Sequence, residues 1–259
     1  MKRSDLICEN AVINAKAKDL FVHKKEINGT KTELVTINEE QSRRYGKASG
    51  SYYTLYIEGG DIKGSVSSVL RELIPEGKAL VAGLGNSEIA SDRLGSACLS
   101  YIPATAHLSA HRDFEALGLR ETTVIGTGVT GKSGIESSDY IRYIAEGTDA
   151  DFIIVIDSLA CSSRERLCST VQITDTGISP GSGVGNGRKR LDRTVCGVPV
   201  IVVGIPTVMD FTDDEGEKLM VTPRNIDLHV KKLSEIIGIG ISMALNPCLS
   251  EEEIRKLII

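Results

Sequence analysis

Two aspartates stand at positions where reactive groups collect in proteins built on a β-sheet. Asp157 directly follows an apolar run at 152–156, and Asp92 lies on the turn that leads from an apolar run at 79–82 into a helix. In α/β proteins the reactive side chains gather at the carboxyl ends of the strands. If these two runs form neighbouring strands, the two carboxylates lie at one edge of the sheet.

Two such carboxylates could hydrolyse a peptide bond. One acts as the base that activates a water molecule, and the other acts as the acid that protonates the leaving amine. Like-charge repulsion and burial raise the pKa of one carboxyl group, so that it keeps its proton. The competing interpretations are that Asp92 caps a helix and that Asp157 belongs to a hydrogen-bonded turn.

A second motif suggests nucleotide binding instead. The segment from Gly126 to Ser133 matches the phosphate-binding pattern GxxxxGK[ST], and it follows a predicted strand and precedes a predicted helix, as that motif requires. Gly134 and Ile135 follow it at once, which gives the helix a weak start. The competing interpretation is a glycine-rich turn that carries a solvated Lys132.

Two further motifs admit more than one interpretation. Asp175, Thr176 and Gly177 form the tripeptide of aspartic proteases, but those are all-β enzymes that need two copies, so a single copy in an α/β chain favours a turn. The loop at 181–187 could hold an anion with its backbone N–H groups. The basic residues that follow form either a solvated face or a pocket for an acidic substrate group: Arg188, Lys189 and Arg190.

The elements that must position these residues alternate along the chain from residue 76 onwards. Apolar runs predict strands at 79–82, 122–125, 151–156 and 198–204. Helices are expected at 92–101 and 137–145, in a long segment that begins at Thr222 and Pro223, and in a short last segment from Ser250. This alternation predicts a three-layer α/β/α sandwich with a mostly parallel central sheet.

Residues 6–75 follow a different pattern. Alternating polarity predicts strands at 31–37 and 52–57, and helices are expected at 38–45 and 65–73. Asn38 and Gln41 have the spacing of a helix-start signature. We therefore expect a small N-terminal β-containing extension (6–75) that packs on an α/β/α core (76–259).

Composition excludes several classes of function. A formal net charge of -5 argues against a nucleic-acid binder with a broad basic face, and no apolar run has the ~18 residues of a membrane span. The six cysteines are scattered without a CxxC motif, which predicts reduced thiols in a cytoplasmic protein and no metal site. The chain has no tryptophan, which argues against stacking on bases.

Taken together, the motifs resemble the germination protease (spore protease) family over nearly the whole chain. The matching segments include the Gly-Leu-Gly-Asn turn at 83–86 followed by Asp92, the stretch 134–139, and the strand that ends Ile-Asp-Ser-Leu-Ala at 156–160. The most specific is the glycine-rich stretch at 172–186. The segments 197–199, 204–208 and 219–223 also match.

The resemblance implies a fold and an activity. The fold is a phosphorylase/hydrolase-like α/β/α sandwich shared with the distantly similar hydrogenase-maturation peptidases. The activity is endoproteolysis of small acid-soluble spore proteins in the spore core during germination, with cleavage after an acidic residue. Members of the family are self-processing zymogens and form tetramers. Residues 1–5 are then a propeptide, and the expected processing site is the bond between Asp5 and Leu6.

The resemblance points to the same two aspartates as the strand-end argument, so we expect Asp92 and Asp157 to be catalytic. Residues expected to support them are Asn86, Glu136, Asp139 and Asp175. Charge complementarity suggests that a basic residue reads the acidic side chain of the substrate; the candidates are Arg93, Arg188, Lys189 and Arg190.

The chain also departs from the family pattern. A short charged link at 210–218 stands where many members carry a long insertion, and Lys132 replaces an apolar residue. Arg93 stands where hydrogenase-maturation peptidases place a metal-binding glutamate, so we expect no metal and no cofactor. Two alternatives stay open: a nucleotide-binding protein that uses Gly126 to Ser133, and a catalytically silent spore protein with the same fold.

Overall fold

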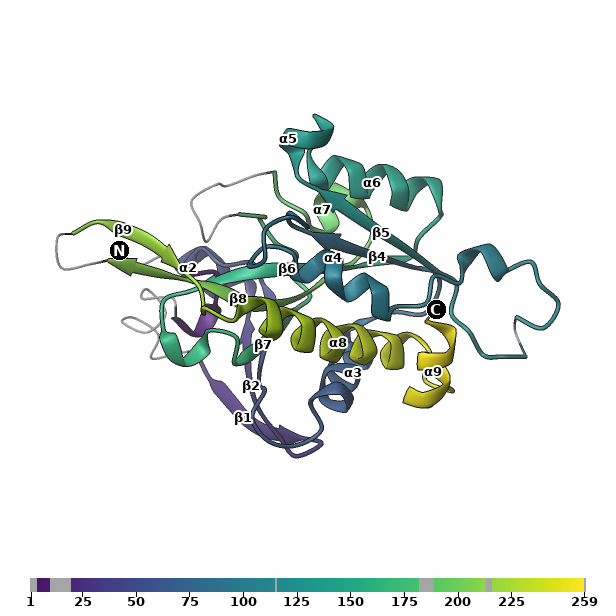
Figure 1. The fold of residues 1–259 in the computed structure, drawn as a ribbon, viewed down its shortest axis with the longest axis horizontal. Helices are drawn as coiled ribbons and strands as arrows, with labels where there is room; N and C mark the ends of the chain where they lie inside the picture. Colours follow the sequence, from purple (N-terminus) through teal and green to yellow (C-terminus); the bar gives the residue numbers. More distant parts are fainter. Residues whose placement is uncertain (1–3, 10–19, 115, 182–188, 213–215, 259) are drawn as a thin grey trace.

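The chain forms one mixed β-sheet with helices on both of its faces. The computed structural model describes residues 4–9, 20–114, 116–181, 189–212 and 216–258. In these ranges nine strands lie in the order β1-β2-β3-β7-β8-β6-β4-β5, and β9 pairs with β8 (Figure 1). The strands are β1 (Val22–Ile27), β2 (Thr30–Ile37), β3 (Gly50–Tyr56), β4 (Ala79–Leu84), β5 (Thr122–Gly128), β6 (Phe152–Cys161), β7 (Thr170–Thr174), β8 (Val200–Thr212) and β9 (Lys218–Val221).

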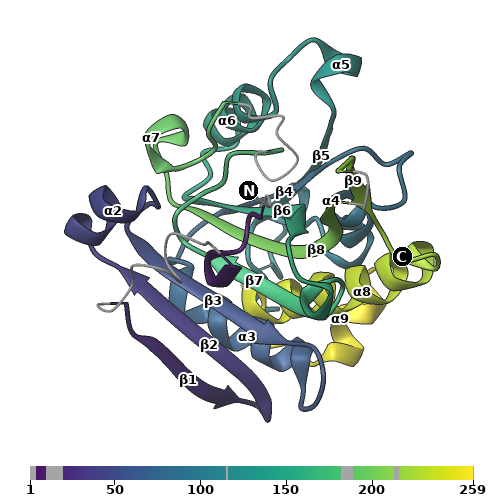
Figure 2. The same ribbon diagram turned by 90° about the vertical axis from the view of Figure 1, so that its left-hand side faces the viewer.

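Within the described residues, parallel pairing is confined to four neighbouring strands at one side of the sheet. β5, β4, β6 and β8 pair in parallel, and they contain the four apolar runs that predicted strands. β1, β2, β3 and β7 pair antiparallel and continue the same sheet on its other side (Figure 2). The N-terminal extension therefore joins the core through the pairing of β3 with β7.

Two layers of helices cover the sheet. α3 (Ile62–Leu73), α4 (Leu94–Cys98) and α8 (Ile226–Leu245) pack on the face that carries Val81, Ile154 and Ile156. α6 (Ser137–Gly147) and α7 (Arg193–Cys196) pack on the face that carries Leu80 and Val155. This alternation of buried side chains along β4 and β6 confirms the α/β/α sandwich.

The remaining helices are short. They are η1 (Ile7–Glu9), α2 (Glu39–Tyr45), η2 (Leu99–Tyr101), η3 (Ala106–Leu108), α5 (Thr130–Ser133), η4 (Arg164–Arg166) and α9 (Glu251–Leu257). The capping signature predicted α2 correctly, because Asn38 and Gln41 each accept a hydrogen bond from the other's backbone N–H. Ser250 and Glu253 form the same arrangement at the start of α9.

Helix α8 begins later than predicted. Its apolar stripe is buried as expected, but its N-cap residue is Asn225. Thr222 does not cap the helix; its hydroxyl instead donates a hydrogen bond to the carbonyl oxygen of Thr207 at 2.8 Å. Likewise α4 begins at Leu94, which leaves Asp92 on the loop before the helix.

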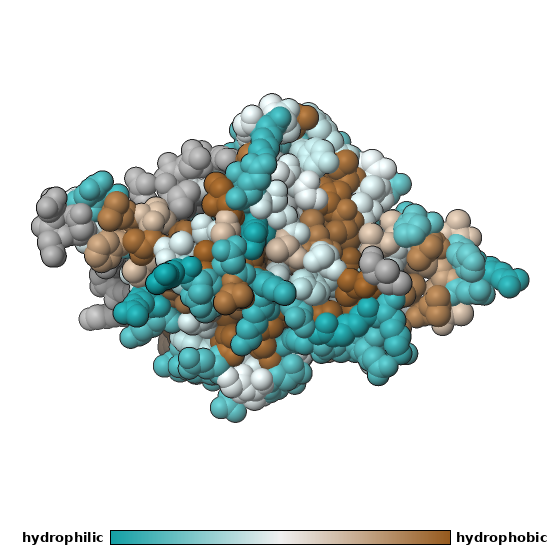
Figure 3. Space-filling model, viewed as in Figure 1, coloured by the Kyte–Doolittle hydropathy of each residue, from teal (hydrophilic) through white to brown (hydrophobic). Residues whose placement is uncertain are grey.

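A hairpin projects from the body of the molecule. It is formed by the end of β8 and by β9, and it exposes the apolar side chains of Phe211, Leu219 and Met220. Figure 3 shows brown atoms, which mark hydrophobic residues, on this projecting part of the molecule at its left. In the described ranges no helix combines the length and the apolar character that a membrane crossing requires.

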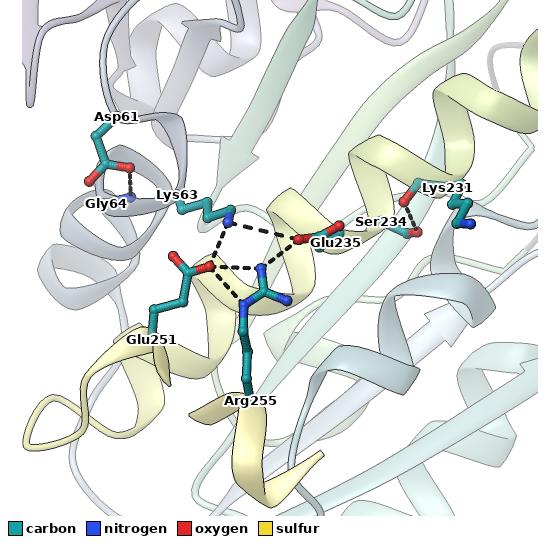
Figure 4. Close-up of polar contacts among 8 residues, drawn as sticks. All are labelled: Asp61, Lys63, Gly64, Lys231, Ser234, Glu235, Glu251 and Arg255. Atoms are coloured by element: carbon teal, nitrogen blue, oxygen red, sulfur yellow. Dashed lines mark hydrogen bonds and ion pairs between the residues drawn. The ribbon is translucent and has the colours of Figure 1, made fainter. Parts of the chain in front are cut away.

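The C-terminal helix is held to the body by charged side chains. Glu251 of α9 accepts hydrogen bonds from Lys63 of α3 at 2.7 Å and from Arg255. Arg255 also donates to Glu235 of α8 at 2.5 Å (Figure 4). This network joins three helices on one face of the sheet.

Candidate active site

Asp157 lies within β6, at the point where its neighbour β4 ends. The last pair between these strands is Gly83 with Ile156, and β6 then continues to Cys161 beside β8. The expectation that the strand stops before Asp157 is wrong, because pairing with β8 extends β6. Asp157 is only 6% exposed, and its Oδ1 accepts a hydrogen bond from the backbone N–H of Ser158 at 2.9 Å.

Asp92 is held on the loop that follows β4. The chain turns at Gly85, whose φ of +95° and closeness to the Asp92 carbonyl oxygen leave no room for a side chain. Asp92 Oδ2 accepts a hydrogen bond from the backbone N–H of Asn86 at 2.8 Å. Asp92 therefore does not cap α4, whose N-cap is Arg93 without a side-chain capping bond.

Helix α4 rests directly on the ends of the two strands that carry these residues. A Cβ atom on Gly95 would clash with the carbonyl oxygens of Leu84 in β4 and Ile156 in β6. Because this glycine allows the close approach, Asp92 and Asp157 line one cavity of about 280 Å³. The predicted catalytic pair is thus brought to one site.

Two hydroxyl groups of this cavity were missed by sequence reasoning. Ser158 and Thr207 line it, and within the described ranges the buried oxygens Ser158 Oγ and Thr207 Oγ1 have no hydrogen-bond partner. Buried hydroxyls are usually paired, so two unpaired ones beside two carboxyl groups are available to a bound molecule. For Thr207, only its place in β8, the strand beside β6, could have suggested that it lines this cavity.

The N-terminal segment enters the same cavity. Asp5 lines it, the Asp5 backbone N–H donates to the carbonyl oxygen of Ala160 at 3.0 Å, and Asp5 Oδ2 accepts from the Ala160 N–H at 2.9 Å. β4 ends before this part of β6, which leaves one strand edge to the segment. Leu6 follows with 1% exposure and packs on Leu159 and Cys161.

Comparison with known proteins identifies the family of this chain. A sequence model described as germination protease matches residues 5–215. The chain belongs to the germination protease family.

Individual germination proteases match this chain over similar numbers of residues. The germination protease of Geobacillus sp. (strain WCH70) is 41% identical over 208 residues, which are 74% of this chain and 56% of that protein. The germination protease of Bacillus cereus (strain B4264) is 39% identical over 207 residues, with the same coverage. The chain thus spans about half the length of these curated germination proteases.

A solved structure is also similar. It is the [NiFe] hydrogenase maturation protease HycI from Thermococcus kodakarensis KOD1, with a TM-score of 0.39 and 15% sequence identity. The match covers 67% of this chain and 98% of the HycI chain.

The residues expected to support the pair in a germination protease lie outside the residues that line the cavity. The Asn86 side chain accepts from the Glu88 N–H, and Asp139 forms an ion pair with Lys189 at 2.6 Å. Glu136 is the N-cap residue of α6 but makes no side-chain capping bond, and the exposed Asp175 accepts from the Ser51 N–H. Of the four, Asn86 contacts Asp92 of the pair, through its backbone N–H.

Three of the four basic residues expected to read an acidic substrate group form ion pairs elsewhere. Arg93 forms an ion pair with Asp227 at 2.7 Å, and Lys189 pairs with Asp139. Arg190 pairs with Asp192. Arg188 and the glycine-rich loop at 182–187 lie outside the described residues.

Despite burial, neighbouring hydrogen-bond donors and a cation lower the pKa of Asp192. Burial would raise the pKa of Asp192, but hydrogen bonds from Thr194 and Val195 and the charge of Arg190 outweigh it and lower the pKa. Asp192 therefore stays ionised and keeps Arg190 in place.

The phosphate-binding motif has little of the required structure. α5 is a single turn, and Gly134 ends it in a left-handed conformation. The Lys132 ammonium group pairs with Glu88 at 2.6 Å. A phosphate-binding loop needs a long helix behind it, so this segment does not favour nucleotide binding. Among the described side chains no three histidine, cysteine, aspartate or glutamate residues cluster as metal ligands would.

Proposed function

We propose that this chain is an endopeptidase that degrades small acid-soluble spore proteins during germination, in the spore core, and cuts after an acidic residue. One observation carries the proposal: Asp92, Asp157 and the acidic residue Asp5 of the chain itself line one cavity. The family supplies the reaction class, and the cavity supplies two carboxyl groups with a peptide segment beside them.

Two aspartates are sufficient for the chemistry. The ionised aspartate takes a proton from a water molecule, and the water oxygen bonds to the carbonyl carbon of the peptide. The resulting oxyanion accepts hydrogen bonds from the hydroxyl groups of Thr207 and Ser158. The second aspartate gives its proton to the peptide nitrogen, and the C–N bond breaks. One water is consumed, and a carboxylic acid and an amine are released.

The strand edge of β6 offers a path for the substrate. β4 pairs with β6 only as far as Ile156, whereas β6 runs on to Cys161, so residues 157–161 keep one edge without a strand of the sheet. An extended peptide can bind such an edge through its own backbone groups. The bond between Asp5 and Ala160 shows a peptide segment using this edge.

The substrate experiment uses the whole chain and a purified small acid-soluble spore protein, with the cut mapped by mass spectrometry. We expect a single cut after a glutamate or aspartate. Asp92→Asn and Asp157→Asn should each lower kcat/KM by about 10²- to 10⁴-fold, the usual contribution of a general acid or base. Asp113→Asn is the matched control, because Asp113 is exposed and lies outside the cavity lining.

Absence of any cut by folded wild-type chain would reject the proposal. It would favour the catalytically silent spore protein with the same fold.

The proposal includes self-processing at Asp5–Leu6. It is supported by the position of Asp5 beside the aspartate pair and by the buried Leu6 after it. Incubation under mildly acidic conditions should remove residues 1–5, and Asp157→Asn should prevent this. An intact mass in the wild-type chain after prolonged incubation would exclude processing at this bond.

We extend the proposal to a homotetramer. The exposed apolar side chains of the β8–β9 hairpin provide surface that association would cover. Sedimentation equilibrium should return four times the 27.8 kDa chain mass. A concentration-independent monomer would contradict it.

A further inference from the structure

A second cavity adjoins the aspartate pair, with Asp5 between the two. It has a volume of about 330 Å³ and is lined by the connection from α2 to β3, by β3 and β7, and by the turn after β7. Among the described residues, Asp5 alone lines both cavities. The residue that precedes the proposed cut therefore lies between the catalytic aspartates and this second space.

Lys47 brings a positive charge into the second cavity. It is half-buried and follows Gly46, which ends α2. The connection that carries it is fixed at both sides, since the Tyr52 hydroxyl donates to the Ala48 carbonyl oxygen at 2.8 Å and Ser49 Oγ donates to Glu39 at 2.5 Å. Lys47 is thus held at the cavity by local structure.

The ammonium group of Lys47 is available to an acidic side chain. Across the described part of the chain, neither a hydrogen bond nor an ion pair holds it. Burial lowers the pKa of Lys47, and the nearby charge of Asp5 acts in the opposite direction, so the two groups attract each other. Arg190, which also lines this cavity, is engaged with Asp192 and with the Thr176 carbonyl oxygen.

We propose that Lys47 is the residue that reads the acidic side chain before the scissile bond. The inference rests on the proposed function and adds the group that sets its specificity. A carboxylate in place of Asp5 can form a charge-assisted hydrogen bond with the ammonium group in a partly dehydrated site. An amide of the same shape would form only a neutral contact and leave the lysine charge without compensation.

The test compares three peptides that differ only in the residue before the cut: glutamate, glutamine or lysine. Wild-type chain should cleave the glutamate peptide with a kcat/KM about 10- to 100-fold above that of the glutamine peptide. Lys47→Gln should bring these two rates close together, because cleavage of the glutamate peptide loses the charge-assisted contact. Lys47→Glu should make the lysine peptide the best of the three.

The controls separate this inference from the function itself. Lys24→Gln removes an exposed lysine of β1 in the same N-terminal extension and should keep the wild-type ratio. An unchanged ratio in Lys47→Gln overturns the role of Lys47 and leaves the endopeptidase proposal standing. Failure of wild-type chain to cut any of the three peptides overturns both.

A further variant tests the inference if Lys47→Gln or Lys47→Glu fails to fold. Lys47→Met keeps most of the aliphatic length and removes the charge. Circular dichroism and urea unfolding determine whether this variant is folded. If folded Lys47→Met still prefers glutamate over glutamine as wild-type chain does, the inference is wrong. Loss of the preference supports it.

Discussion

Glu9 anchors the N-terminal segment after it passes the aspartate pair. Its carboxylate accepts hydrogen bonds from the Ser162 N–H at 2.5 Å, from the Ser162 hydroxyl at 2.9 Å and from the Ser163 N–H at 3.0 Å. The side chain is only 5% exposed. A buried carboxylate with several donors holds a segment firmly, so the position of Asp5 and Leu6 depends on Glu9 as well as on β6.

We expect Glu9→Gln to loosen this segment. The new amide NH₂ group would face backbone N–H donors of Ser162 or Ser163, so the free energy of unfolding should fall by about 1–3 kcal/mol. Urea denaturation measures the loss, with Glu58→Gln at an exposed position as control. Equal unfolding midpoints for wild type and Glu9→Gln would contradict the anchoring role.

At the scale of elements, the contact of α4 with the ends of β4 and β6 builds the site. Gly95 makes this contact possible because any side chain would meet the backbone of both strands. Asp92 lies just before the helix and Asp157 just after the end of the β4–β6 pairing, so a shift of α4 changes the distance between the two carboxyl groups.

Gly95→Ala should therefore reduce both stability and activity. Overpacking at such a contact costs about 1–3 kcal/mol in the free energy of unfolding, and peptide cleavage should fall further than the loss of folded chain explains. Thermal unfolding and kcat/KM on one spore-protein peptide test this. Gly147→Ala is the control, because a Cβ there would meet open space. Wild-type kcat/KM in a folded Gly95→Ala chain would disprove the positioning role.

Local sequence signals predicted an element well where the residues that determine it lie within the element itself. The α2 capping box and the buried stripe of α8 follow from residues a few positions apart. Strand ends depend on partners: β6 and β8 exceed their apolar runs because they pair with each other, whereas β1 and β7 were not predicted. β1 is an edge strand of largely polar residues, so its sequence lacks the alternation of apolar and polar residues that predicts a half-buried strand.

The same distinction applies to the site. The position of Asp92 and Asp157 at one cavity was predictable, because both follow apolar runs that form adjacent parallel strands. The position of Lys47 at the adjoining cavity was not predictable, since Lys47 lies on an ordinary connection and the next strand, β3, lies beside β7 only in the folded sheet.

At the scale of the whole molecule, Glu251 attaches the C-terminal helix α9 to the helical layer that contains α3 and α8. Hydrogen bonds from Lys63 and Arg255 lower the pKa of Glu251 below its ordinary value of 4.5, although partial burial opposes this. Because the folded-state pKa is lower than the unfolded one, the stabilisation is complete above about pH 4.5 and is lost as the pH falls through the folded-state value.

Glu251→Gln should accordingly cost about 0.5–1 kcal/mol at neutral pH, the scale of an exposed ion-pair network. The difference from wild type should shrink in acid, below the ordinary pKa of a glutamate. Urea unfolding at neutral and acid pH measures it. Glu252→Gln, which removes an exposed pair with Lys256 on the same helix, should have a smaller effect. A Glu251→Gln deficit that stays constant with pH would refute this assignment.

The pairing of Asp92 with Asp157 is tested most directly by a double variant. Two groups that act on one water work as a unit, so Asp92→Asn with Asp157→Asn should lower kcat/KM on a spore-protein substrate no further than the more damaging single variant does. Losses that multiply in the double variant, or a single variant that keeps wild-type cleavage, would show that the two aspartates do not share the reaction.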